Sequence, residues 1–166
     1  MAEQHQMFKS QNFHCYLTTL QKIQEVSGLD ISPLNNSVSG FIGGIGFSGT
    51  LCGVVIGWVL TLGLKYGIDP SDRGYKDTLN TIYQGLLKSD GIFRDERVFP
   101  AAADFNRCKT LYRMVEDKYG DCNCTTVSGL DINRASSIQE FMGKNKIEDC
   151  RRLSEAIARK TSQLLN

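Results

Sequence analysis

The sequence predicts an all-α fold, a single-domain helical bundle of about five to six helices with a buried apolar central helix that follows a glycine-rich loop. Apolar side chains recur at intervals of three and four residues in several segments, which is the period of an amphipathic helix. The alternation typical of half-buried strands is nearly absent. One helical segment is apolar on almost every side, so we expect it at the centre of the bundle.

The expected elements follow one another along the chain. The first helix is predicted over residues 12–27, and Gly28 is placed to cap its C-terminus. A loop comes next, because Pro33 and five glycines favour turns before Thr50. The apolar helix is predicted over 51–64. Further helices are predicted over 72–87, 101–119, 136–143 and 147–165, and the whole chain, 1–166, is expected to form one domain with a flexible segment at 1–11.

The charge balance limits the classes of partner. Lys and Arg total 19 against 18 for Asp and Glu, so no basic field attracts nucleic acid. The first nine residues lack the positive and apolar regions of a secretory signal. We therefore expect a cytoplasmic protein that binds no nucleic acid. In a reducing compartment its six cysteines are metal ligands, reactive thiols or small buried hydrophobes rather than disulfides.

Residues 31–64 contain no Asp, Glu, Lys or Arg, which raises the question of a membrane span. The first half of this stretch has the turn residues described above, whose backbone groups lipid cannot satisfy. The continuous apolar helix has fourteen residues, whereas about 20 are needed to cross a bilayer. A central helix of a soluble bundle is therefore expected, with no membrane span.

Glycines recur every four residues at Gly49, Gly53 and Gly57 and predict a smooth helix face. Such a face allows another backbone to approach closely, and it equally admits a bulky cofactor. Both interpretations remain open from the sequence. The same face is a candidate contact surface for a homodimer.

Cys52 is the cysteine whose surroundings are most informative. It stands where the uncharged glycine-rich stretch turns into the apolar helix. Backbone N–H groups of a glycine loop and the positive end of a helix both lower the pKa of a thiol and favour its thiolate. Cys52 is therefore the best candidate for a reactive or metal-binding thiol.

The other cysteines are less clear. Cys122 and Cys124 form a C-x-C pair in a predicted loop, where burial is not expected, so at least one of them should have a chemical role. Cys15 and Cys150 lie at or near apolar stripes and are either ligands or core residues. Cys108 lies on the apolar stripe of its helix and is expected to be structural.

Several common sites are excluded by the absence of their motifs. The cysteine spacings match neither a zinc ribbon nor a ferredoxin. The chain also lacks a P-loop, a dinucleotide glycine fingerprint and an H-E-x-x-H pair. His14 is expected to be a solvent-facing or capping residue.

Three segments carry a resemblance to a known family. Residues 52–57 read Cys-Gly-Val-Val-Ile-Gly, residues 62–67 read Leu-Gly-Leu-Lys-Tyr-Gly, and residues 39–44 read Ser-Gly-Phe-Ile-Gly-Gly. Together they resemble the C_GCAxxG_C_C family of redox-active proteins, and the similarity covers most of the chain. The family pattern has four cysteines, and in this chain it implies that the four are Cys15, Cys52, Cys124 and Cys150.

The resemblance also implies a cofactor. A related helical domain of split-Soret cytochromes is associated with an iron-sulfur centre, so a cluster is implied here. This chain departs from the pattern in having Val54 in place of alanine, Tyr16 in place of a small residue, and a surface insertion at 88–104. Cys122 is an extra thiol that can compete with Cys124 as a ligand or act as a resolving cysteine.

Our leading hypothesis is an electron-transfer protein rather than a catalyst with its own substrate. It binds an iron-sulfur cluster, [2Fe-2S] or larger, and exchanges single electrons with a redox protein partner. The proposed ligands are Cys15, Cys52, Cys124 and Cys150, with Cys122 in reserve. One rival is a metal-free thiol-disulfide oxidoreductase in which Cys52 is the nucleophile, and the other is a zinc-binding accessory protein.

Overall fold

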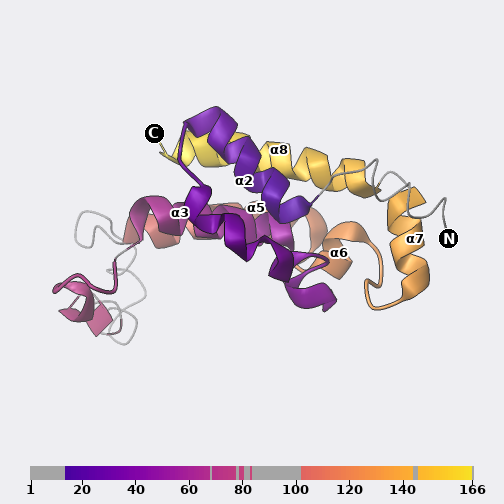
Figure 1. Ribbon diagram of the computed structural model, residues 1–166, viewed down its shortest axis with the longest axis horizontal. Coiled ribbons are helices and arrows are strands. Elements are labelled where there is room, and N and C mark those ends of the chain that lie inside the picture. Colours follow the sequence, from indigo (N-terminus) through magenta and orange to yellow (C-terminus); the bar gives the residue numbers. More distant parts are fainter. Residues whose placement is uncertain are drawn as a thin grey trace.

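The computed structural model describes residues 14–67, 69–77, 79–80, 83, 102–143 and 146–165. In these ranges the chain is helical and contains no strand, which confirms the predicted all-α class (Figure 1). The α-helices are α2 (Cys15–Ser27), α3 (Gly53–Tyr66), α5 (Ala102–Tyr119), α6 (Cys124–Ser128), α7 (Ala135–Gly143) and α8 (Lys146–Leu165). Two 3₁₀ helices, η1 (Ser32–Phe41) and η2 (Ile45–Phe47), lie between α2 and α3.

Helix α3 is the central helix that the apolar run predicts. It packs against α2, α5 and α8, and α2 also lies along α8, as Figure 1 shows. Val54, Val55, Trp58 and Leu62 of α3 are almost completely buried. Their neighbours Leu111, Leu153 and Ile157 extend this core across α5 and α8, and a second apolar cluster of Tyr16, Leu20, Ile31 and Ile56 joins α2 to α3.

The close contact between α2 and α3 depends on glycine. A Cβ atom at Gly57 would lie 3.1 Å from Cβ of Thr19 and 3.3 Å from the carbonyl oxygen of Tyr16. At Gly57 the glycine face therefore receives a neighbouring helix. Gly49 does not continue this face, because it lies in the loop before α3 with φ +73° and contacts Thr125 instead. The predicted three-glycine face is wrong at that position.

The first helix begins three residues later than predicted. His14 has an extended backbone, and its Nδ1 accepts a long hydrogen bond of 3.5 Å from the N–H of Leu17. This is the capping role that the sequence left open for His14. At the other end Gly28 adopts φ +70° and donates its N–H to the carbonyl of Gln24, as expected of a C-cap.

Polar side chains of α3 and α5 donate hydrogen bonds to the last carbonyls of α8. The Tyr66 hydroxyl donates to the carbonyl of Leu165 at 3.1 Å, and Nε of Arg107 donates to the carbonyl of Leu164 at 3.0 Å. The Arg107 guanidinium also lies 4.4 Å from the centre of the Tyr66 ring. These contacts join the ends of α3 and α8 to the first turns of α5.

Parts of the sequence prediction lie outside the described residues. These are the segment 1–11, residues 78, 81–82 and 84–87 of the helix predicted over 72–87, and residues 88–101 of the predicted insertion. In the described part of 72–87, residues 72–74 form a bend and a turn, and residues 75–77, 79–80 and 83 are helical. Residues 102–104 belong to α5, so they are helical rather than part of a surface excursion. In the described ranges, none of the helices combines the length and hydrophobicity that crossing a membrane requires.

The packing at Gly57 can be tested by adding one methyl group. Gly57→Ala would push α2 away from α3, and we expect it to lower the free energy of unfolding by about 1–3 kcal/mol. Gly63→Ala is the matched control, because a Cβ on this exposed glycine of the same helix meets nothing within 4 Å. It should raise the free energy of unfolding by about 0.5–1 kcal/mol. Urea denaturation measures the free energy of unfolding of both variants. An equal change in this free energy for Gly57→Ala and Gly63→Ala would contradict the close packing of α2 on Gly57.

Candidate functional site

Four cysteines lie at or near the starts of four helices. Cys15 is the first residue of α2, Cys52 is the N-cap of α3, and Cys124 is the first residue of α6. Cys150 follows in the second turn of α8. Cys52, Cys124 and Cys150 are buried, and Cys15 is half-buried. The site is therefore assembled from the N-terminal ends of helices that are distant in sequence.

A short antiparallel bridge brings Cys52 beside the C-x-C segment. Leu51 pairs with Asn123, the Cys52 N–H donates to the carbonyl of Cys122 at 2.8 Å, and the Cys124 N–H donates to the carbonyl of Thr50 at 2.7 Å. The N–H and hydroxyl of Thr125 both donate to the carbonyl of Gly49, at 3.0 and 2.9 Å. The glycine-rich loop is thus fastened to the start of α6, and this fixes two of the thiols next to each other.

Gly53 makes room for the third thiol. A Cβ atom at this position would lie 2.6 Å from Sγ of Cys15 and 2.9 Å from the carbonyl oxygen of Phe41. The sulfur of Cys15 can rest against the backbone beside Cys52 only because residue 53 has no side chain. The sequence predicts a smooth glycine face here, and the structure shows that a cysteine sulfur occupies it.

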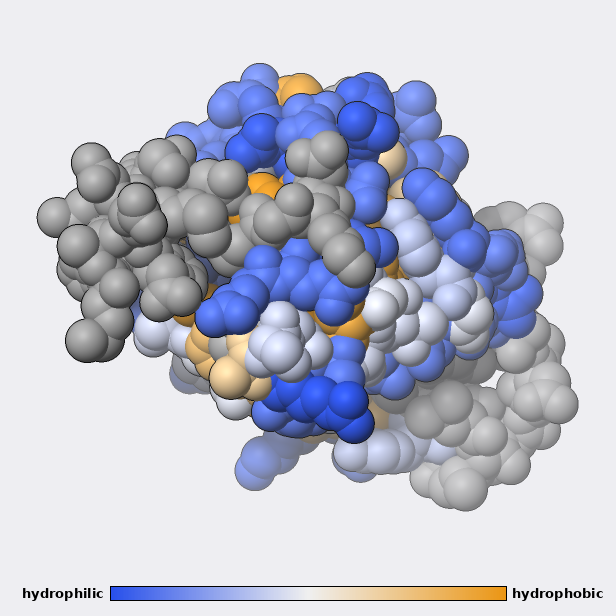
Figure 2. All heavy atoms as spheres, turned by 90° about the vertical axis from the view of Figure 1, so that its right-hand side faces the viewer, coloured by the Kyte–Doolittle hydropathy of each residue, from blue (hydrophilic) through white to orange (hydrophobic). Residues whose placement is uncertain are grey.

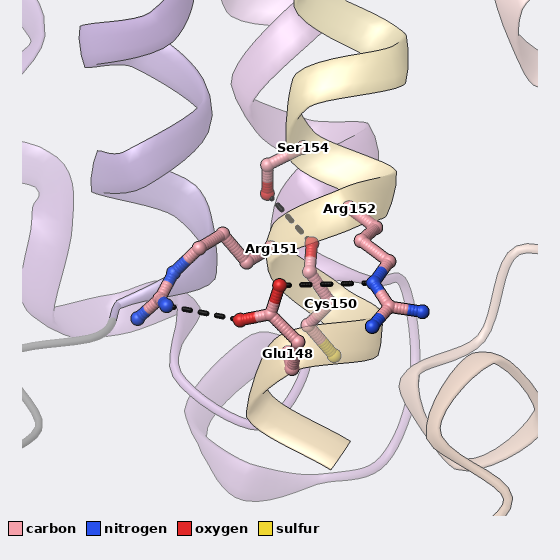
Figure 3. A network of polar contacts seen from close by, with 5 residues as sticks. All are labelled: Glu148, Cys150, Arg151, Arg152 and Ser154. Carbon is pink, nitrogen blue, oxygen red and sulfur yellow. Dashed lines mark hydrogen bonds and ion pairs between the residues drawn. The ribbon is translucent and has the colours of Figure 1, made fainter. Parts of the chain in front are cut away.

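The fourth thiol enters from α8. Helix α8 lies along α2, and Cys150 is 6% exposed. Its carbonyl oxygen lies 3.0 Å from Oγ of Ser154 (Figure 3). In the same view Glu148 lies between Arg151 and Arg152, with ion-pair distances of 3.0 and 3.7 Å. These ion pairs are exposed, so each contributes at most about 1 kcal/mol.

The thiols are close enough for the charge of one to affect the others. Burial is the largest cause that raises the pKa of Cys15, and the charges of Cys52, Cys150 and Cys124 raise it further. Burial and then Cys52 raise the pKa of Cys124 to about 12, and burial, Cys52 and then Cys124 raise that of Cys150 to about 12. Every pair among these four thiols therefore interacts.

Burial alone raises the pKa of Cys52, and two backbone N–H groups offset part of this increase. The N–H groups of Val54 and Val55, in the first turn of α3, lower the pKa of the Cys52 thiol, although neither makes a capping hydrogen bond of standard geometry. The N–H of Tyr16 does the same for Cys15. The sequence assigned this role in part to the glycine loop. In the described residues, the donors that act on Cys15 and Cys52 come from helix first turns instead.

The two remaining cysteines differ from the four. Cys122 is 3% exposed, its thiol donates to the carbonyl of Tyr112 at 3.5 Å, and its pKa is raised to about 11, mainly by burial. The expectation that the C-x-C pair would not be buried is therefore wrong, because α5 covers Cys122. Among the cysteines, only Cys52 acts on its pKa. Cys108 is half-buried and packs against the main core, as predicted for a structural residue.

The described side chains around the four thiols do not form a preorganised site for a single metal ion. Among the described side chains, no group of three or more His, Cys, Asp or Glu is placed to hold a metal ion. The surface at the end of the molecule where α7 lies is mostly hydrophilic, with small apolar areas between (Figure 2).

These features define a helical, cysteine-centred protein whose buried thiols gather at helix starts. A sequence model of the family described as "Putative redox-active protein (C_GCAxxG_C_C)" matches residues 13–164. The chain belongs to this family, and membership assigns it a redox role. Comparison with curated proteins and with solved structures gives no match.

The contact between Gly53 and Cys15 gives a direct test. Gly53→Ala should displace the Cys15 sulfur, so that Cys15 reacts faster with iodoacetamide in metal-free protein while Cys108 keeps its rate. The free energy of unfolding should fall by about 1–3 kcal/mol, because the site is overpacked. Peptide mapping by mass spectrometry gives the rates, and Gly63→Ala again serves as the control. An unchanged rate at Cys15 would show that its sulfur does not rest on Gly53.

The buried thiols also predict how stability depends on pH. In the unfolded chain a thiol ionises near pH 8.5, whereas Cys124 and Cys150 in the folded protein have pKa values of about 12. Above about pH 8.5 the unfolded state binds fewer protons, so the free energy of unfolding should fall by roughly 1.4 kcal/mol per pH unit for each thiol that stays protonated.

Urea denaturation of reduced, metal-free protein between about pH 8 and about pH 10 measures this slope, which rests on the pKa shifts of the buried thiols. Cys124→Ala and Cys150→Ala should each make the slope shallower, and Thr61→Val, which removes no ionisable group, should leave it unchanged. A slope that no cysteine substitution alters would contradict the assignment of the effect to these thiols.

Proposed function

We propose that the protein carries single electrons through an iron-sulfur cluster, [2Fe-2S] in our preferred form, bound by Cys15, Cys52, Cys124 and Cys150. The observation that carries the proposal is that these four thiols gather: the sulfur of Cys15 lies against Gly53 beside Cys52, the Leu51–Asn123 bridge places Cys52 beside Cys124, and the thiols are close enough to raise the pKa values of Cys15, Cys124 and Cys150. Iron-sulfur clusters are held by four cysteine thiolates, so the donor set fits the group. When bound, such a cluster supplies reversible one-electron chemistry.

The chain's own part is to hold the four sulfurs and to control their charge. Burial raises the pKa of every one of these thiols, so without a cation the folded site favours protonated sulfur. The cysteines that held a metal would bind it as thiolates. The N–H groups of Tyr16, Val54 and Val55, in the first turns of α2 and α3, would then favour the negative charge of the Cys15 and Cys52 thiolates.

The surrounding side chains keep water away from the sulfurs. Cys52 belongs to the main core with Val55 and Trp58, and Cys124 packs with Leu130 and Ile132. Hydrogen bonding and burial set the potential of an iron-sulfur centre. Tyr16 is bulkier than the residue in the family pattern. It packs in the apolar side-chain cluster between α2 and α3, and its hydroxyl lies 2.7 Å from Oγ of Ser37.

Two alternatives are less well supported. A metal-free thiol-disulfide enzyme needs an accessible thiol of lowered pKa, whereas Cys52 is 2% exposed and its pKa is raised. Zinc binds thiolates but has no redox chemistry, whereas the family to which the chain belongs is described as redox-active.

The proposal includes a redox protein partner and a cytoplasmic location. A homodimer through the glycine face is not part of it, because Gly53 and Gly57 face α2 of the same chain. The electron exchange must therefore use another surface.

Anaerobic reconstitution with iron and sulfide tests the proposal. Wild-type protein should gain visible sulfur-to-iron absorption and contain iron and acid-labile sulfide in equal amounts. Serine at Cys15, Cys52, Cys124 or Cys150 should abolish or alter the spectrum, because each substitution removes one thiolate. Cys108→Ser and Cys122→Ser are the matched controls and should retain it. Colourless wild-type protein after reconstitution, or zinc bound without iron, would refute the proposal.

A further inference from the structure

A pair of hydroxyl groups lies one helical turn beyond two of the cysteines. Thr19 follows Cys15 by four residues on α2, and Ser154 follows Cys150 by four residues on α8. Residues four apart share one face of a helix. The facing helices α2 and α8 therefore carry two successive layers, a thiol layer and a hydroxyl layer. The sequence signal is a cysteine followed at i+4 by Thr or Ser.

The hydroxyl layer contains a side-chain hydrogen bond between the buried faces of these helices. Oγ1 of Thr19 lies 3.0 Å from Oγ of Ser154, and both residues are 0% exposed. Oγ1 of Thr19 also lies 2.7 Å from the carbonyl oxygen of Cys15, and Oγ of Ser154 lies 3.0 Å from that of Cys150. The Ser154 hydroxyl donates to the carbonyl of Cys150, and the Thr19 hydroxyl shares its one hydrogen between Oγ of Ser154 and the carbonyl of Cys15.

This contact is well placed to fix the register of the helices. A hydroxyl pair has a required distance and direction, whereas the apolar contacts around it tolerate sliding. Thr19 is also held from its other side, because Gly57 of α3 allows the close approach of Thr19 described above. A slip of α8 along α2 would break the hydroxyl contact before it exposed apolar surface.

We propose that Thr19 and Ser154 are positioning residues that hold Cys15 and Cys150 opposite each other before any cofactor binds. The register is a property of the metal-free protein. Its consequence for a cluster rests on the proposed function. Removal of either hydroxyl should let α8 shift relative to α2, so that the two thiols meet less often.

Substitutions that keep shape but remove the hydroxyl test this role. Thr19→Val and Ser154→Ala each remove the contact, and neither leaves an unpaired hydroxyl, because the surviving group keeps the carbonyl of its own helix. Thr19→Ser restores the hydroxyl. Thr61→Val is the matched control, since Thr61 is also 0% exposed and its hydroxyl donates to the carbonyl of Gly57 at 2.8 Å.

The first measurement uses reduced, metal-free protein. Dibromobimane joins two thiols that lie close together, and mass spectrometry gives the ratio of Cys15–Cys150 cross-link to singly modified protein. Thr19→Val and Ser154→Ala should each lower this ratio about fivefold, the factor expected for one buried hydrogen bond. The double variant should lower it no further, because both substitutions remove the same contact. Thr19→Ser and Thr61→Val should stay at the wild-type ratio.

The second measurement is the electron paramagnetic resonance spectrum of reduced, reconstituted protein, which should change in Thr19→Val and not in Thr61→Val. The proposal is overturned if Thr19→Val keeps the wild-type cross-link ratio, or if Thr61→Val lowers that ratio as much as Thr19→Val does. It is also overturned if the effects of Thr19→Val and Ser154→Ala on the ratio add in the double variant. Failure of the wild type to take up iron would refute the proposed function, while the cross-link ratios would still decide the register.

Discussion

The burial of four ionisable sulfurs in one place is the constraint on which the rest of the structure depends. Protonated thiols tolerate an apolar core, but thiolates there need compensation. Compensation comes from the N-terminal ends of helices, because their first N–H groups have no partner within the helix. For Cys52, the N–H groups of Val54 and Val55 lower the pKa that burial raises. The same position can therefore hold a neutral thiol without metal and a thiolate with it.

Three local features serve this constraint. The bridge between Leu51 and Asn123 holds the glycine-rich loop to the start of α6. Gly53 leaves the space that the sulfur of Cys15 occupies. The hydroxyl contact between Thr19 and Ser154 joins α2, which carries Cys15, to α8, which carries Cys150. Each feature joins segments that are far apart in sequence, so the site exists only in the folded chain.

The long helices are predictable from the sequence because their apolar period is strong. Helix α8 begins within one residue of its predicted start, and α3 within two, since an unbroken apolar run marks it. Helix α6 and the 3₁₀ helix η1 were missed. Five residues are too few to show a period, and α6 is held by bonds to Gly49 and Thr50 rather than by its own sequence.

The candidate site is only partly predictable for a related reason. The glycine loop pointed to Cys52, but the local sequence left Cys15 and Cys150 as ligands or core residues, and only the family resemblance selected them. Their proximity depends on tertiary contacts with Gly53 and α2. The burial of Cys122 was also missed, because it depends on α5. That the four gathered cysteines act as ligands remains a prediction.

A crystal structure of the protein, reconstituted with iron and sulfide and kept without oxygen, would test the central claim most directly. The account predicts electron density for an iron-sulfur cluster bonded to the sulfurs of Cys15, Cys52, Cys124 and Cys150, with Cys122 still directed at the carbonyl of Tyr112. Density for a cluster on a different set of residues, or a disulfide between any of these four cysteines in protein that has bound no iron, would contradict it.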